Sequence, residues 1–271
     1  MKILDFLKIK KKDSIYPFII AFIILLPLVV ILSILLIGYN REFIKGILIE
    51  AHGLLFDVVL FGIIITIVLK RNRRYYRINY YKEEIDDFRG WESTMASYRL
   101  TGLLRRLAKL NAEYINADNC YLENAQLNNI KLQGSFKQIN FNNANLYGAN
   151  LKGDFYEANF SFSNLERANL SKSNLINVNL SNANLTEANL NGTWLISANL
   201  ENANLEGASI VEADLKDAIL KNVNFEGAVL WIKDIDIDEL GKVKSLYNAE
   251  LHPEILKKIK KKYPYLLKKT K

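Results

Sequence analysis

Residues 183–205 read ANLTEANLNGTWLISANLENANL, and a leucine stands at every fifth position of this stretch. The same spacing holds over residues 155–230, where a large apolar residue falls at sixteen successive fifth positions. A period of five matches neither the 3.6-residue turn of a helix nor the two-residue alternation of a strand. Each unit must therefore turn a corner and stack on copies of itself, which predicts a solenoid.

Each unit has a second regular feature two residues before its large apolar residue. A small side chain stands there, Ala in ten of the sixteen units, and the residue between the two is Asn in ten units. We expect the small and large residues to point inward and the Asn to face outward. Each large residue should contribute about 1.5–3 kcal/mol by burial. The predicted buried core includes Leu165, Leu170, Leu175, Leu180, Leu185, Leu190, Leu195, Leu200 and Leu205.

The units Ala183-Asn184-Leu185 and Ala198-Asn199-Leu200 show the motif A-(D/N)-L unchanged. In this motif the chain resembles the pentapeptide-repeat family. The resemblance implies an all-β solenoid, a right-handed quadrilateral pentapeptide-repeat β-helix in which four units make one coil. The repeat extends back to Leu122 through two single-residue slips, at Gly134-Ser135-Phe136 and Gly153-Asp154-Phe155.

Composition divides the chain into five segments. They are a basic N-terminus (1–16), a transmembrane hairpin (17–71), a helical connector and N-terminal cap (72–117), the β-helix (118–232) and a basic helical C-terminal cap (233–271). The hairpin is predicted from two apolar stretches, 18–38 and 47–69, each long enough to span a bilayer. Five basic residues flank the outer end of each stretch and two lie between them. By the positive-inside rule, both termini and the solenoid are expected to be cytoplasmic. The Asn-, Ile- and Lys-rich composition favours a bacterium, so the expected location is its inner or plasma membrane.

Three ionisable residues, Glu50, His52 and Asp57, lie in the first half of the second apolar stretch. Glu50 and Asp57 are seven residues apart, so they share a helix face. One interpretation places them at the membrane interface, with a hydrogen bond across the hairpin. The alternatives are a metal or proton site, and a face through which hairpins associate into a homo-oligomer.

Helices are predicted on both sides of the repeats. Apolar spacing indicates helices over 80–88 and 92–110, broken near Gly90, and over 236–245 and 252–262. The string EEIDDFRGW (83–91) looks like the segment before the repeats in membrane-anchored bacterial pentapeptide-repeat proteins. Its physical interpretation is a cap over the open first coil. The alternative is a partner site on Trp91 with Arg105 and Arg106.

Charge is distributed unevenly along the chain. Residues 1–117 carry +7 (18 basic, 11 acidic), residues 118–230 carry −5 (7 basic, 12 acidic) and residues 231–271 carry +5 (11 basic, 6 acidic). The basic character therefore lies outside the repeats. A basic groove for nucleic acid is not expected.

The chain shows no motif for catalysis. It has no Gly-rich phosphate loop, no Ser/His/Asp set and no Cys/His metal spacing, and its two His residues, His52 and His252, lie in different segments. Asp214 and Asp217 are expected to belong to a solvated face. Cys120 takes the small inward position of the first unit, which predicts a buried packing thiol. No enzymatic activity, cofactor or metal is expected.

One candidate contact surface follows from the stacking of units. If four units make a coil, residues twenty apart share a face, and Lys137, Tyr156, Ile176, Ile196 and Lys216 form one column. Trp194 lies on the same face, where most units carry Asn. Tyr156, Ile176, Trp194 and Ile196 are therefore predicted to form an exposed apolar stripe that contacts a protein. The alternative is chance scatter of apolar surface residues.

These patterns favour a non-catalytic, membrane-tethered scaffold or protein-binding module. Its expected partners are membrane lipid at the N-terminal hairpin and an unidentified protein, with a possible homo-oligomer and no nucleic acid. Some pentapeptide-repeat proteins resemble B-form DNA and protect type II topoisomerases, so the resemblance implies a DNA-mimic inhibitor or protector as one alternative. A membrane-associated secreted effector, or an accessory subunit of a transport complex, is another.

Overall fold

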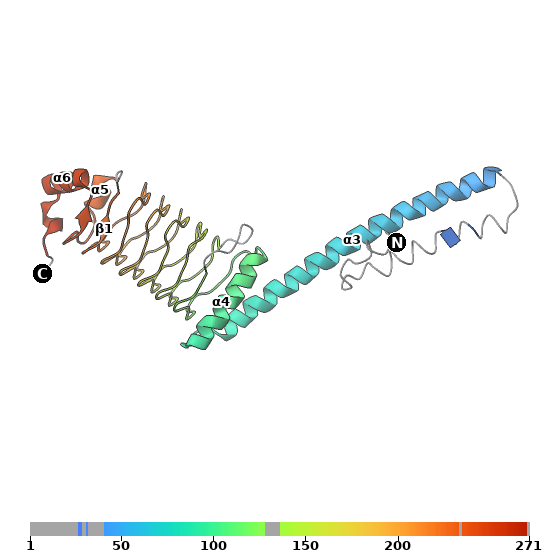
Figure 1. Ribbon diagram of the computed structural model, residues 1–271, viewed down its shortest axis with the longest axis horizontal. Coiled ribbons are helices and arrows are strands. Elements are labelled where there is room, and N and C mark those ends of the chain that lie inside the picture. Colours follow the sequence, from blue (N-terminus) through green and yellow to red (C-terminus); the bar gives the residue numbers. More distant parts are fainter. Residues whose placement is uncertain (1–26, 29–30, 32–40, 128–135, 233–234, 270–271) are drawn as a thin grey trace, which may run out of the picture. The chain divides into compact units, whose positions relative to one another are not determined.

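The computed structural model describes residues 27–28, 31, 41–127, 136–232 and 235–269 of the 271-residue chain (Figure 1). The chain divides into two compact units, Met1–Tyr76 and Arg77–Lys271. The second unit contains the repeats and the helices at both of their ends. We call its repeat segment, residues 118–232, the rod.

Helix α3 (Arg41–Asp87) begins in the first unit and ends in the second. Its apolar sequence contains the exposed carboxylates Glu50 and Asp57 and ends at a basic run that starts with Lys70. No helix in the described part of the chain is long and apolar enough to cross a membrane. The predicted span 18–38 lies almost wholly outside the described residues, and 47–69 lies within α3. The structure therefore does not support the predicted transmembrane hairpin.

Helix α4 (Thr94–Lys109) lies against the first coil of the rod. It begins at the N-cap Ser93, whose side chain accepts a hydrogen bond from the Ala96 amide at 3.1 Å. The turn before it contains Gly90, which has a φ of +75° and donates its amide to the Asn119 carbonyl. The apolar face of α4 joins the same buried cluster as the first repeats and so covers their open end. Its buried residues are Ala96, Ser97, Leu100, Leu103, Leu104, Leu107 and Ala108.

The rod consists of stacked coils whose backbones pair in parallel (Figure 1). Bridges join Asp154 to Asn174, Asn174 to Trp194, and Trp194 to Asp214, each twenty residues further along. Twenty residues are four units of five, so one coil contains four units. The nine leucines predicted to form the core lie buried inside the coils, each no more than 1% exposed.

The first two coils differ in length from the twenty-residue coils that follow them. Asn116 pairs with Asn140, 24 residues away, and Asn140 pairs with Asn159, 19 residues away. The 19-residue coil contains the single-residue slip at Gly153. The slip predicted at Gly134-Ser135-Phe136 lies mostly outside the described residues.

Asparagine stabilises the stacking of the coils, a role that the sequence pattern did not indicate. Asn159 donates from Nδ2 to Asn140 Oδ1 (2.9 Å) and accepts at its own Oδ1 from Asn179 Nδ2 (3.3 Å). The same Oδ1 accepts from the amide and the hydroxyl of Ser161 (3.1 and 2.7 Å). These half-buried amides therefore link neighbouring coils and close the local turn.

The coil continues beyond the predicted end of the rod. Strand β1 (Val229–Leu230) pairs in parallel with β2 (Glu250–Leu251), and α5 (Ile237–Leu240) occupies only four residues. The helix predicted over 236–245 is therefore wrong after residue 240. The reason is that Ser245 and Leu246 repeat the polar and large positions of a unit, and Ser245 Oγ accepts from the Tyr247 amide as Asn does elsewhere.

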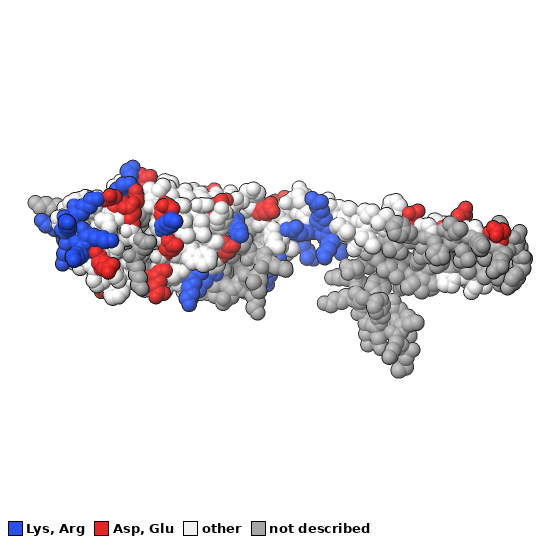
Figure 2. All heavy atoms as spheres, turned by 90° about the horizontal axis from the view of Figure 1, so that it is seen from above, with Lys and Arg blue, Asp and Glu red and all other residues white. Residues whose placement is uncertain are grey.

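Two short helices end the chain. Helix α6 (Pro253–Lys262) buries Ile255 and Ile259, and the 3-10 helix η1 (Pro264–Leu267) buries Leu266. Basic side chains gather at this end of the second unit (Figure 2). The exposed lysines of α6 are Lys257, Lys258, Lys260, Lys261 and Lys262.

Candidate binding surfaces

The predicted stripe lies on one face of the rod. The Glu157 amide donates to the Ile176 carbonyl and the Asn177 amide to the Ile196 carbonyl, both at 3.0 Å, so these residues lie on successive coils. Trp194 is 57% exposed, whereas Tyr156, Ile176 and Ile196 are half-buried. Trp194 is thus the apolar side chain that this face presents most fully to solvent.

Charged residues lie on both sides of the stripe. On the N-terminal side, Lys137 Nζ lies 3.3 Å from Asp154 and 6.0 Å from the centre of the Tyr156 ring. The pKa of Tyr156 is raised, chiefly because its hydroxyl is hydrogen-bonded to Glu157. On the C-terminal side, Asp214 Oδ1 accepts from the Lys216 amide at 3.0 Å. Asp154, Glu157 and Asp214 thus each have a partner within the rod. Trp194 lies between these polar residues.

Other exposed apolar residues occur elsewhere on the described rod. Phe162, Ile219 and Trp231 are exposed, and each stands in a column of units different from that of Trp194. Ile219 occupies the position before the large residue, as Trp194 does, and pairs with Asn199. It therefore provides a matched comparison for Trp194 on another face.

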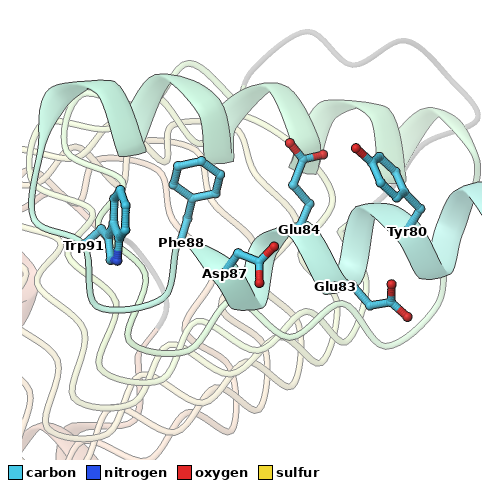
Figure 3. A pocket seen from close by; sticks show the side chains of 6 residues that line it. All are labelled: Tyr80, Glu83, Glu84, Asp87, Phe88 and Trp91. Atoms are coloured by element: carbon cyan, nitrogen blue, oxygen red, sulfur yellow. The ribbon is translucent and has the colours of Figure 1, made fainter.

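A second candidate surface is a groove at the end of α3 (Figure 3). Its volume is about 410 Å³. Phe88 and Trp91 form one end of it, with their ring centres 5.6 Å apart and their planes at 72°. We call this the cap groove, and its lining residues are Tyr80, Glu83, Glu84, Asp87, Phe88 and Trp91.

The cap groove was only partly anticipated from the sequence. Trp91 lines it, as the alternative partner site would require, but Arg105 and Arg106 do not, and Arg106 lies over the ring of Tyr81 at 5.7 Å. The spacing of three and four residues between Tyr80, the acidic residues and Phe88 places them on one helix face. That spacing was the signal that could have identified the groove.

The repeats match a known family profile. Residues 119–153, 154–192 and 198–230 match the profile of pentapeptide repeats, in eight copies. The rod is a pentapeptide-repeat β-helix. A comparison with curated proteins finds no match.

Several solved structures are similar to the pentapeptide-repeat rod. HetL, a pentapeptide repeat protein involved in heterocyst differentiation regulation in the cyanobacterium Nostoc, is 28% identical over 46% of this chain and 63% of its own, with a TM-score of 0.22. The chain thus spans less than two thirds of HetL. Rfr23 of the cyanobacterium Cyanothece is 24% identical over 59% of this chain and 99% of its own, with a TM-score of 0.25. Trypsin-treated QnrB1, a plasmid-mediated fluoroquinolone resistance protein, is 18% identical over 55% and 81%, with a TM-score of 0.28.

Metal-ligating residues do not come together in the part of the chain that the structure describes. Within that part, no group of three His, Cys, Asp or Glu side chains could hold a metal ion. Glu50 and Asp57 are exposed on α3, and the side chain of His52 lies outside the described residues.

The thiol of Cys120 lies inside the first coil of the pentapeptide-repeat rod and is 1% exposed. Burial raises its pKa to about 11, and the nearby Arg89 lowers it only in part. Because the thiolate is the reactive form, we expect the folded protein at pH 8 to react with a disulfide reagent roughly a hundredfold more slowly than the unfolded protein. The rate should rise as pH increases toward 11. Rapid labelling of the folded protein at pH 8 would contradict the buried position.

Proposed function

We propose that this chain is a non-catalytic scaffold whose pentapeptide-repeat rod binds a partner protein through the face that carries Trp194. The observation that carries the proposal is the exposure of this Trp in a column whose other members are Asp154, Asn174 and Asp214. A large exposed aromatic side chain among polar residues is typical of an anchor residue in a protein interface. The half-buried Ile176 and Ile196 beside it would extend the apolar contact.

The proposal places the scaffold at a bacterial inner membrane, with both termini and the rod cytoplasmic. Its support is the apolar part of α3, whose exposed side chains would be covered by lipid. The basic residues after Leu69 would then lie among anionic headgroups. The exposed apolar residues are Leu54, Val58, Leu60, Phe61, Ile63, Ile64, Ile65, Ile67, Val68 and Leu69.

The test is in-cell crosslinking of the full-length chain in its native host, followed by separation of membranes and identification of captured proteins. Trp194→Asn is the main variant, because Asn is the residue that most units carry at this position and so should be accepted by the fold. We expect it to lower recovery of the specific partner by about tenfold. Ile219→Asn makes the same kind of change on another face and should leave recovery unchanged.

Each outcome of this experiment bears on one part of the proposal. Equal recovery of the partner by wild type and Trp194→Asn would overturn the binding face. Recovery of the chain in the soluble fraction would overturn the membrane location. Capture of a type II topoisomerase, or of transport subunits, would replace the general scaffold by one of the two alternative functions.

A further inference from the structure

We propose that the cap groove is a second binding site, which takes a Lys- or Arg-bearing peptide segment of a partner protein. The cap groove lies on the helical cap, whereas the stripe lies on the rod, so the two sites are separate. The proposal depends on the shape of the groove, on its exposed rings and on its unpaired carboxylates.

The rings of the groove are open to solvent. Tyr80 and Trp91 are 59% and 62% exposed, and Phe88 packs partly against the core. Figure 3 shows Phe88 and Trp91 side by side at one end and Tyr80 at the other, with the carboxylates between them. A peptide segment lying along the groove would therefore meet aromatic and acidic groups together.

The cations near the groove already have partners. Arg99 donates from Nε to Glu84 at 2.7 Å, and Arg89 pairs with Asp86 and Asp118. Lys82 donates to the carbonyl of Glu113 at 2.8 Å. Arg99 thus neutralises Glu84, while Arg89 and Lys82 have partners other than the carboxylates that line the groove.

Two carboxylates of the groove remain unpaired. Within the described residues, Glu83 and Asp87 have no ion pair, and both are exposed. They lie one helical turn apart, so their negative charges are neighbours on the helix surface. Like charges at this spacing disfavour the isolated helix, and a cationic ligand would relieve that repulsion.

Aromatic faces and carboxylates together recognise cationic side chains. A guanidinium or ammonium group is attracted to the face of an indole ring and forms charge-assisted hydrogen bonds with a carboxylate. The negative charge of the groove opposes an anionic lipid surface or a nucleic acid. Its three carboxylates offer few of the about six to eight oxygen ligands that Ca²⁺ takes, and within the described residues no group of acidic, His or Cys side chains could hold a metal ion. A basic peptide is therefore the ligand class that fits both the negative charge and the aromatic rings of the groove.

The test is a binding measurement on the full-length chain in detergent micelles. The probe is a fluorescein-labelled peptide of four Arg-Ser-Gly repeats, followed by fluorescence anisotropy, and a Glu-Ser-Gly peptide is the control ligand. We expect the arginine peptide to bind and the affinity to fall as salt is added. The double variant Glu83→Gln and Asp87→Asn should weaken binding about tenfold, and Trp91→Leu should weaken it also.

A matched variant separates the groove from the general charge of the protein. Glu206→Gln with Glu226→Gln removes two carboxylates from the rod, and we expect it to bind the peptide as wild type does. Equal binding by the groove double variant, or equal loss in the rod double variant, would overturn the proposal. So would equal binding of the Glu-Ser-Gly peptide. Trp194→Asn should leave peptide binding unchanged, so failure of the stripe and failure of the groove are distinguishable.

Discussion

Leu180→Asp is expected to unfold the rod. Leu180 is fully buried, and its column contains Phe160 and Leu200 in the coils on either side. The substitution removes a buried leucine and places a carboxylate in an apolar interior, which together cost roughly 5 kcal/mol or more. That cost is comparable to the whole stability of a typical domain. Because each coil is stabilised mainly by its neighbours, the loss should spread along the rod.

Circular dichroism and thermal unfolding would measure this effect. Asn182→Asp is the matched control, because it introduces the same side chain at an exposed corner only two residues away. Asn182 has a φ of +59°, and Asp tolerates this left-handed backbone. We expect the control to change stability by about 0.5 kcal/mol or less. A Leu180→Asp protein with the spectrum and melting temperature of wild type would show that Leu180 does not point into the core.

Asn159→Ala is expected to destabilise the rod by roughly 2 kcal/mol, although Asn159 is only half-buried. The change removes one amide that donates to the coil before it and accepts from the coil after it. Asn140 and Asn179 would each lose a partner, and the local turn would lose its hydrogen bond to the Ser161 amide. Urea denaturation of wild type and variant measures the difference in the free energy of unfolding.

Asn159→Asp distinguishes the two functions of this side chain. The carboxylate still accepts from the Asn179 amide and from Ser161 but cannot donate to Asn140. Asp154 shows that a carboxylate is accepted at this position, since it accepts from Asn174 Nδ2 at 3.0 Å. We expect a loss of stability smaller than that of Asn159→Ala. If the Asn159→Ala variant and wild type unfold at the same urea concentration, the asparagine ladders, meaning the hydrogen bonds between asparagines of neighbouring coils, contribute nothing to the stability of the rod.

The features that the sequence predicted well are those that depend on local periodicity. The five-residue spacing alone indicated a repeating coil. It also indicated that Leu180 and the leucines at the same position of other units point inward. The expectation that Asn merely faces outward was incomplete, because its partners lie about twenty residues away. The helix predicted over 236–245 overlooked that Ser245 and Leu246 have the polar and large residues of a repeat unit. Hydrophobic spacing in so short a segment suits a helix and a coil equally.

The candidate sites were less predictable than the fold. The column that contains Trp194 follows from counting units, but the sequence could not show that Ile176 and Ile196 are half-buried while Trp194 is exposed. The cap groove depends on which acidic residues form ion pairs with α4. Only the packing of α3 against α4 decides that Glu84 is neutralised by Arg99 while Glu83 and Asp87 are not.

The sequence by itself determined the five-residue repeat and which of its leucines point inward. It also determined that the repeats give way to helical segments at both ends of the rod. These properties follow from the order of large and small side chains, which is enough to specify which residues avoid water. The tertiary structure alone decided the asparagine ladders, the return of the chain to the coil after α5, the exposure of Trp194 and the charge of the cap groove. Each of these depends on contacts between residues far apart in the chain, and their geometry exists only after the coils and helices have packed.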